Sequence, residues 1–302
     1  MKAKILTLGI LMIFLAGCSV YRYSPNFAPQ NVIQKVKAHR VAIAAYYEMS
    51  EDEYLQRLKQ KHYLDMSLFV KEDGQSPDKA IKAFPYYLGD NPILIKKDEQ
   101  TQNVVVAYLG AGIILKDNYI LTVNHLFDRE HQNNTTAMHI WVLQEGIDHP
   151  IQASLVVRTQ CEVSQIFSDD YAIIRMEENL GLPGLKIAKP NKLKDGDKVI
   201  FTGSTGGLAF FSRFSSITKL QHFFQKDTEG RLHLSFWEDF PFWTVYPGGP
   251  GDSGGPVVNF KGEIVTVMYC GITVYSEDYI FGNPTQMIWD FLKKYNLEYL
   301  GK

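Results

Sequence analysis

The segment Gly251-Asp252-Ser253-Gly254-Gly255-Pro256 is the most distinctive stretch of this sequence. A simple turn before the apolar residues 257–259 would need only one or two glycines. Glycine has no Cβ atom, so a bound carbonyl group can approach the main chain closely at these positions. The same glycines free two backbone N–H groups to face one point. Ser253 is therefore a candidate nucleophile in a turn built for close approach.

A serine hydroxyl is a weak nucleophile and needs a neighbouring base. One histidine, His125, follows two apolar segments, 110–115 and 119–123, that read as strands joined by a polar turn. The other histidines have no comparable context: His39, His62, His131, His139, His149, His222 and His233. None of them forms a spaced metal-binding motif such as His-Glu-x-x-His, so we expect no metal and no cofactor.

The base in turn needs a carboxylate that orients it. Asp170 begins the apolar segment Asp170-Tyr171-Ala172-Ile173-Ile174-Arg175, and Asp169 precedes it directly. Successive residues of a strand point to opposite faces, so only one of the two can face His125. We expect Asp170 to be the orienting residue and Asp169 to be a solvated turn residue.

These three segments together resemble the chymotrypsin-like serine proteases. The segment 251–256 resembles their nucleophile motif, 110–125 their Gly-x-Gly strand and Leu-Thr-x-x-His segment, and 170–175 their aspartate strand. Ala172 falls at the family's alanine, which favours Asp170 over Asp169. The chain order His125, Asp170, Ser253 is also that of chymotrypsin. The resemblance implies a serine endopeptidase that acts through an acyl-enzyme, with the N–H groups of Gly251 and Ser253 as the oxyanion hole.

The resemblance covers about residues 93–302, and it extends to bacterial HtrA-type proteases through Gly196-Asp197-Lys198-Val199 and the glycines that follow. We expect no PDZ domain after the C-terminal helix. Asp252 stands where HtrA relatives often carry asparagine. Two other classes remain open: a non-catalytic binding or scaffold protein on the same fold, and an esterase that uses the same triad.

The substrate pocket is the least readable part of the site. Pro247 lies six residues before Ser253, where trypsin-like members carry an aspartate, so a preference for basic residues is not supported. We expect Tyr269, Cys270 and Gly271 to form the pocket wall. These residues suggest a small or medium apolar side chain in the substrate.

Short apolar segments separated by turn residues predict an all-β body. They are 104–109, 113–115, 119–123, 140–143, 155–157, 171–175, 198–201, 232–236, 256–259 and 263–268. The family resemblance narrows this to two six-stranded antiparallel β-barrels of chymotrypsin type, with a C-terminal helix over 287–297. Apolar residues at helical spacing predict an N-terminal helical extension over 41–71, and Ser50 with Glu53 matches a capping box.

The N-terminus reads as a targeting segment. Lys2 and Lys4 precede an apolar run over 5–15, which is too short to span a membrane. Leu15-Ala16-Gly17-Cys18 resembles a bacterial lipobox, which implies cleavage before Cys18 and a lipid on its sulfur. Since Ser19 is not the usual retention signal, we expect an outer-membrane lipoprotein of the bacterial cell envelope.

The predicted organisation has four parts. They are a signal peptide over 1–17, a tether over 18–40, a helical extension and linker over 41–92, and a trypsin-like protease domain over 93–302. Once Cys18 is lipidated, Cys161 and Cys270 remain, and they form either a disulfide or two buried thiols.

Composition excludes several classes of protein. The chain has 302 residues, of which 45% are hydrophobic, so wholesale disorder is excluded. The formal net charge is −2, which lacks the basic excess of a nucleic-acid binder. The expected partners are protein or peptide substrates and a membrane reached through the lipid, whereas the oligomeric state is left open.

Overall fold

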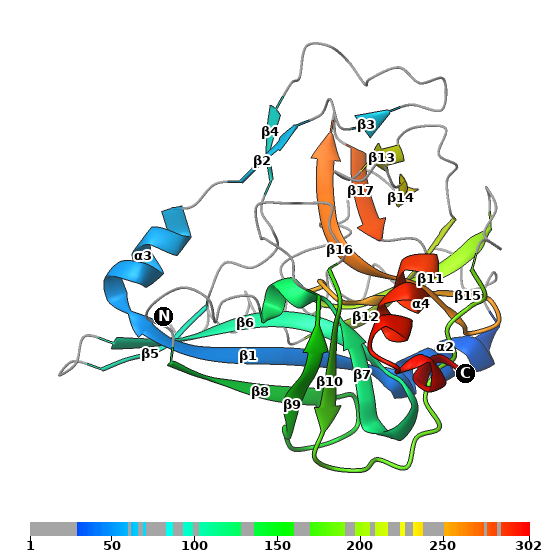
Figure 1. The fold of residues 1–302 in the computed structure, drawn as a ribbon, viewed down its shortest axis with the longest axis horizontal. Coiled ribbons are helices and arrows are strands. Elements are labelled where there is room, and N and C mark those ends of the chain that lie inside the picture. The colour runs from blue at the N-terminus through cyan, green and yellow to red at the C-terminus, as the bar shows by residue number, and fades with distance from the viewer. Residues whose placement is uncertain are drawn as a thin grey trace, which may run out of the picture.

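Six antiparallel strands close into a barrel (Figure 1). In this computed structural model their order is β1–β8–β9–β10–β7–β6, and β1 pairs with both β8 and β6, which closes the ring. A further strand, β5, extends the sheet beyond β6. The bounds are β1 Arg40–Ser50, β5 Ile93–Lys97, β6 Asn103–Ile114, β7 Tyr119–Thr122, β8 Thr136–Gln144, β9 Ile151–Arg158 and β10 Ala172–Met176.

The structure describes residues 29–59, 62–65, 69–70, 83–86, 93–98, 103–127, 136–159, 170–190, 197–205, 209–216, 224–226, 232–237, 251–274, 277–282 and 285–302. The predictions for the signal peptide, Cys18, Cys161, Asp169 and Pro247 fall outside these residues.

A second antiparallel sheet has the order β12–β11–β15–β16–β17–β14–β13–β3. Its first six strands form a ring in which β12 and β14 meet through one residue pair, Ser216 with Trp237. The predicted all-β fold is thus confirmed, with the first barrel complete. The bounds are β3 Phe69–Val70, β11 Lys198–Thr205, β12 Ala209–Ser216, β13 Phe224–Lys226, β14 Leu232–Trp237, β15 Pro256–Asn259, β16 Ile264–Val274 and β17 Glu277–Gly282.

Helices are few and short. The C-terminal helix α4 spans Thr285–Lys294, which confirms most of the helix predicted there. Its buried side chains pack on the same core as the first barrel, and its Thr285 hydroxyl donates to the carbonyl of Val265 in β16 at 2.6 Å. The remaining elements are α2 Gln30–His39, α3 Glu51–Lys59, η3 Lys116–Asn118, η4 Asn124–Leu126, η5 Glu298–Gly301 and the β2–β4 pair, His62–Asp65 with Ala83–Tyr86.

The prediction of a helix over 41–71 is wrong for residues 41–50, which lie in strand β1 of the first barrel. It is also wrong for 62–65 and 69–70, which form strands β2 and β3. Most of β1 is buried on both faces, so its sequence lacks the alternation that would mark a half-buried strand. The helix begins only at Glu51, where the N–H of Glu53 donates to Ser50 Oγ at 3.2 Å as the capping box predicts. The barrel therefore takes a strand from before the expected boundary at residue 93.

Part of the predicted tether is also folded. Residues 30–39 form α2, whose Val32 and Val36 lie in the main core. Val32 and Lys35 pack near Gly262 in the turn between β15 and β16, so α2 links the second sheet to the strand that follows it in the first. The periodicity was missed because only two of these ten residues are buried and apolar.

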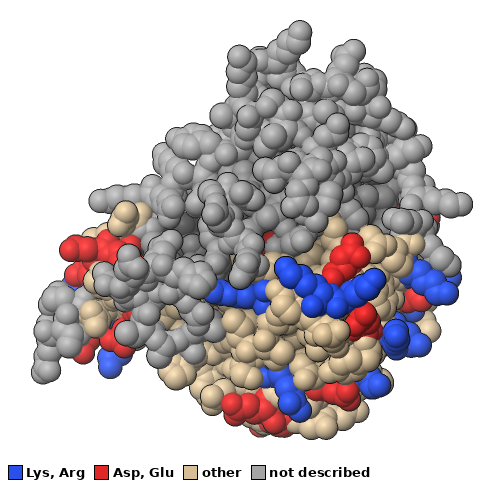
Figure 2. Space-filling view, viewed as in Figure 1, with Lys and Arg blue, Asp and Glu red and all other residues tan. Residues whose placement is uncertain are grey.

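The described surface mixes both signs of charge. On the face drawn in Figure 2, Lys and Arg side chains alternate with Asp and Glu side chains. Across the part of the chain that the structure describes, no helix is both long and apolar enough to cross a membrane.

Candidate active site

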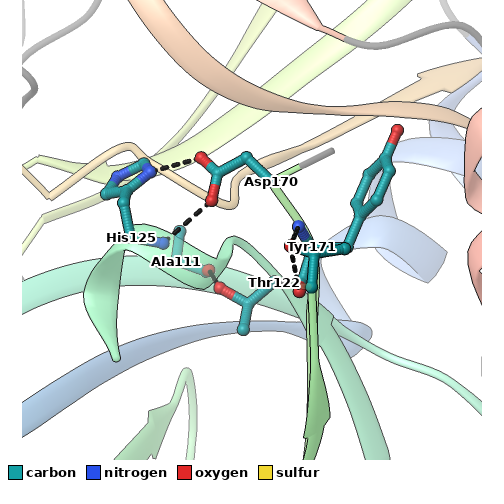
Figure 3. Close-up of polar contacts among 6 residues, drawn as sticks. Ala111, Thr122, His125, Asp170 and Tyr171 are labelled. Atoms are coloured by element: carbon teal, nitrogen blue, oxygen red, sulfur yellow. Dashed lines mark hydrogen bonds and ion pairs between the residues drawn. The ribbon is translucent and has the colours of Figure 1, made fainter. Parts of the chain in front are cut away.

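His125 lies in the short helix η4, which begins two residues after the last residue of strand β7. Its backbone N–H donates to Oδ1 of Asp170 at 2.8 Å, and its Nδ1 lies 2.5 Å from Oδ2 of the same carboxylate (Figure 3). Both side chains are buried. One carboxylate therefore fixes the main chain of His125 and the orientation of its ring, and it favours the tautomer with the proton on Nδ1.

Asp170 is held in place by the residue that follows it. Tyr171 exchanges hydrogen bonds with Thr159, whose N–H donates to the Tyr171 carbonyl at 2.9 Å and whose Oγ1 accepts from the Tyr171 N–H at 3.1 Å. The ring of Tyr171 packs on Phe291 of α4, with centroids 5.4 Å apart. Asp170 lies two residues before β10, and the residue that follows it is held through both its backbone and its ring.

The Ser253 turn lies between the two sheets. The Ser253 carbonyl accepts from the N–H of Ala111 in β6 at 2.7 Å. The next residue, Gly254, donates its N–H to the carbonyl of Met268 in β16 at 2.7 Å. One strand of each sheet therefore holds the turn, which places Ser253 at their junction.

Gly110 shows that the segments carrying His125 and Ser253 meet. A Cβ atom at Gly110 would lie 2.3 Å from Cδ1 of Leu126 and 3.0 Å from the carbonyl oxygen of Ser253. Leu126 is the neighbour of His125, so both segments pack against the same glycine. The structure thus brings His125, Asp170 and Ser253 into one region.

The backbone of the Ser253 turn has the conformation of a glycine-rich turn. Gly251 and Gly254 have positive φ angles of 98° and 84°, which favour glycine. Among the described residues, neither the N–H of Gly251 nor that of Ser253 donates a backbone hydrogen bond.

The predicted pocket residues lie in strand β16. Cys270 and Gly271 pair with Phe281 and Ile280 of β17. Tyr269 is only 2% exposed and belongs to the main hydrophobic core.

The sequence analysis did not identify two residues that lie near the site. Thr159 holds Tyr171, and Tyr47 of β1 donates its hydroxyl to the carbonyl of Leu126 at 2.9 Å. Neither lies in a recognisable motif, and Tyr47 lies in the segment predicted to be helical. Only the pairing of β1 with β6 and β8 reveals its place.

The fold and this site define a trypsin-like peptidase domain. The model of the family described as "Trypsin-like peptidase domain" matches residues 110–267, more than half of the chain, and the chain belongs to that family.

Curated relatives agree with this assignment. The chain is 28% identical over 199 residues to a probable periplasmic serine endoprotease DegP-like of Hahella chejuensis, covering 64% of this chain and 35% of the relative. It is 25% identical over 204 residues to a probable periplasmic serine protease do/HhoA-like of Haemophilus influenzae, covering 66% and 39%. The chain thus spans little more than a third of the length of these relatives.

The fold is similar to that of the Rv3671c protease of M. tuberculosis. The crystal structure of its active form matches with a TM-score of 0.51 and 16% identity, over 90% of this chain and 86% of the other. At this level of identity the likeness concerns the fold.

Proposed function

We propose that this protein is a serine endopeptidase that cleaves peptide bonds through Ser253, His125 and Asp170. The observation that carries the proposal is the two-point contact of Asp170 with His125, made beside the Ser253 turn. Family membership supports the same reaction.

In the proposed mechanism each of the three residues has one role. Ser253 Oγ attacks the scissile carbonyl carbon while His125 Nε2 takes the hydroxyl proton, and His125 then returns that proton to the leaving amine. Asp170 remains ionised throughout and stabilises the imidazolium that forms. Water then hydrolyses the acyl-enzyme by the same sequence of proton transfers.

The negative charge that develops on the carbonyl oxygen needs donors fixed in advance. The N–H groups of Gly251 and Ser253 would supply them, because the turn is held by β6 and β16 before substrate arrives. Such donors require no reorganisation during the reaction, which is why rigid support of the turn matters.

The test is covalent labelling of purified mature protein with a fluorophosphonate, with Ser253→Ala as control. We expect stoichiometric labelling of the wild type, none of the variant, and turnover of casein. Turnover of ester substrates without any peptide cleavage would instead indicate an esterase. Folded wild type that does not label would indicate a scaffold protein or a latent enzyme.

We further propose that the protein is attached to the bacterial cell envelope by a lipid on Cys18. The lipobox-like segment supports this, and relatives named as periplasmic agree with export. Since α2 begins at Gln30, the tether from Cys18 would reach at most roughly 40 Å when fully extended.

Cys18→Ala should abolish metabolic labelling by palmitate and release the protein from membranes, because no acyl chain then anchors it. Palmitate incorporation and membrane fractionation measure this, with Ser19→Ala as control. A Cys18→Ala protein that stays in the membrane fraction would show that another part of the chain is the anchor.

A further inference from the structure

The turn that carries His125 has little internal support. Helix η4 is three residues long, and the N–H of Phe127 donates to the carbonyl of Asn124 at 2.7 Å. A single turn of 3-10 helix is not stable by itself, so its geometry depends on contacts from outside. Asp170 supplies such contacts to the backbone N–H and the ring of His125, in the middle residue of this short helix.

The residues that follow His125 are held by two other side chains. The Tyr47 hydroxyl donates to the carbonyl oxygen of Leu126 at 2.9 Å, and the guanidinium of Arg158 donates to the carbonyl oxygen of Phe127. Tyr47 comes from β1 and Arg158 from the end of β9. Two strands of the first barrel thus hold two consecutive carbonyl groups directly after His125.

Tyr47 is fixed at its side chain and Arg158 at its main chain. Tyr47 is 1% exposed, and its ring packs edge-on against Tyr108 at a centroid distance of 5.5 Å. The main chain of Arg158 is tied to the C-terminal helix region, because its carbonyl accepts from the Tyr295 hydroxyl at 3.1 Å. A donor on a rigid ring restricts its acceptor more than one on a mobile surface side chain would.

We infer that Tyr47 and Arg158 are positioning residues for His125, an inference that rests on the proposed function. The Leu126 carbonyl belongs to the same residue whose side chain packs on Gly110, next to the carbonyl of Ser253. Movement of Leu126 therefore changes the place of His125 relative to the Ser253 turn. Small displacements of a catalytic base have large effects on rate.

Tyr47→Phe tests the inference, because it removes the hydroxyl and keeps the ring. We expect kcat to fall about 10-fold while KM changes less than about 2-fold. The matched control is Thr285→Val, which also removes one buried hydroxyl-to-carbonyl hydrogen bond, but between α4 and β16. It should lower Tm to a similar extent and leave kcat unchanged.

A second measurement does not depend on turnover. The proton that His125 Nδ1 shares with Asp170 should give a low-field NMR resonance, which Asp170→Asn abolishes. We expect Tyr47→Phe to shift or broaden this resonance and Thr285→Val to leave it as in the wild type. Should Tyr47→Phe not fold, Arg158→Gln removes the neighbouring contact and carries the same expectation.

The inference is overturned if Tyr47→Phe leaves both kcat and the resonance unchanged, or if Thr285→Val lowers kcat equally. Wild type that fails to label with a fluorophosphonate both before and after a cut within residues 72–100 would refute the proposed function separately. In that case the NMR resonance still tests the positioning role. A resonance that changes in Tyr47→Phe but not in Thr285→Val supports this role, and a resonance that changes in neither variant overturns it.

Discussion

The carboxylate of Asp170 accepts two hydrogen bonds from His125, one from its backbone N–H and one from its ring. Both the charge and the shape of this carboxylate therefore matter for the orientation of His125. Replacement by asparagine keeps the shape, but an amide that donates to Nδ1 selects the wrong tautomer of His125. We predict that Asp170→Asn lowers kcat about 10⁴-fold, as tautomer loss does in enzymes with this triad. Steady-state kinetics with a peptide substrate measure the loss.

Asp169→Asn is the control, and it should change kcat by less than about 3-fold if Asp169 is a turn residue as predicted. A severe loss in Asp169→Asn, together with a mild one in Asp170→Asn, would reverse the assignment of the orienting carboxylate.

Gly254 has both a positive φ angle and no room for a side chain. A Cβ atom there would lie 2.2 Å from the carbonyl oxygen of Ala111 and 2.3 Å from Oγ1 of Thr122. We predict that Gly254→Ala abolishes fluorophosphonate labelling, because the Ser253 turn must move away from β6. Labelling and Tm measure the effect.

Gly146→Ala is the matched control. Gly146 has a φ angle of 93°, but no atom of the described residues, its two chain neighbours aside, lies within 4 Å of a Cβ placed there. This variant should lose only about 1–2 kcal/mol of stability from backbone strain and should keep full labelling. Equal damage from both variants would mean that φ alone, rather than the close approach at Gly254, limits this turn.

The sequence motifs predicted those site residues that lie within the motifs themselves. His125 and Asp170 were both identified from short segments, and the structure places them in contact. Tyr47 and Thr159 could not be identified in this way, because their importance comes from partners far along the chain. The sequence around a buried hydroxyl group does not show which carbonyl group it will bind in the folded protein.

Strand β1 illustrates the same limit for a whole element. It pairs with β6 over its full length and also with β8. Central strands that are covered on both faces read as continuous apolar runs, which periodicity cannot separate from a buried helix. The strands β7 and β10, which are bounded by turn residues and follow a recognised pattern, were predicted with nearly correct limits.

Helix α2 ends on a buried histidine, which makes its packing sensitive to pH. Burial lowers the pKa of His39 below its ordinary value of 6.5, and the charge of Lys35 acts in the same direction. The unfolded chain therefore takes up this proton at a higher pH than the folded one. The stability that neutral His39 contributes is present above about pH 6.5 and is lost as the pH falls through the folded pKa.

We predict that the loss of Tm on acidification from about pH 7.5 to 5 is smaller in His39→Gln than in the wild type. Calorimetry at the two pH values measures this difference. His149→Gln is the control, because exposed His149 lies between Glu178 and Asp148, which raise its pKa. Its removal should not reduce the acid sensitivity, and an equal reduction in both variants would contradict the role of His39.

At the scale of the whole molecule, the site lies where two sheets meet. Strand β11 of the second sheet contacts β1 and β6 of the first, and one core cluster contains residues of both sheets and of α4. The family resemblance predicted this arrangement, but it did not predict that α2 and β1 are part of it. The folded unit that positions the site therefore includes residues from 30 onward, well before the segment that carries the motifs.

This arrangement bears on activation. In trypsin-like zymogens, the carboxylate before the serine pairs with a newly cut N-terminus. Here Asp252 is fully buried in the intact chain, and a buried carboxylate is costly unless the surrounding fold accommodates it. Strand β1, which carries Tyr47, lies within the barrel, so a cut after this strand would separate it covalently from the rest of the barrel.

We therefore predict that the full-length mature protein turns over casein or peptides without prior cleavage. Intact mass measured before and after the assay checks that the chain is uncut, and Ser253→Ala purified in the same way excludes a contaminating protease. Activity that appears only after a cut within residues 72–100 would refute this. The new N-terminus would then become the candidate partner of Asp252, and β1 would have to stay bound to the barrel through its strand pairing alone.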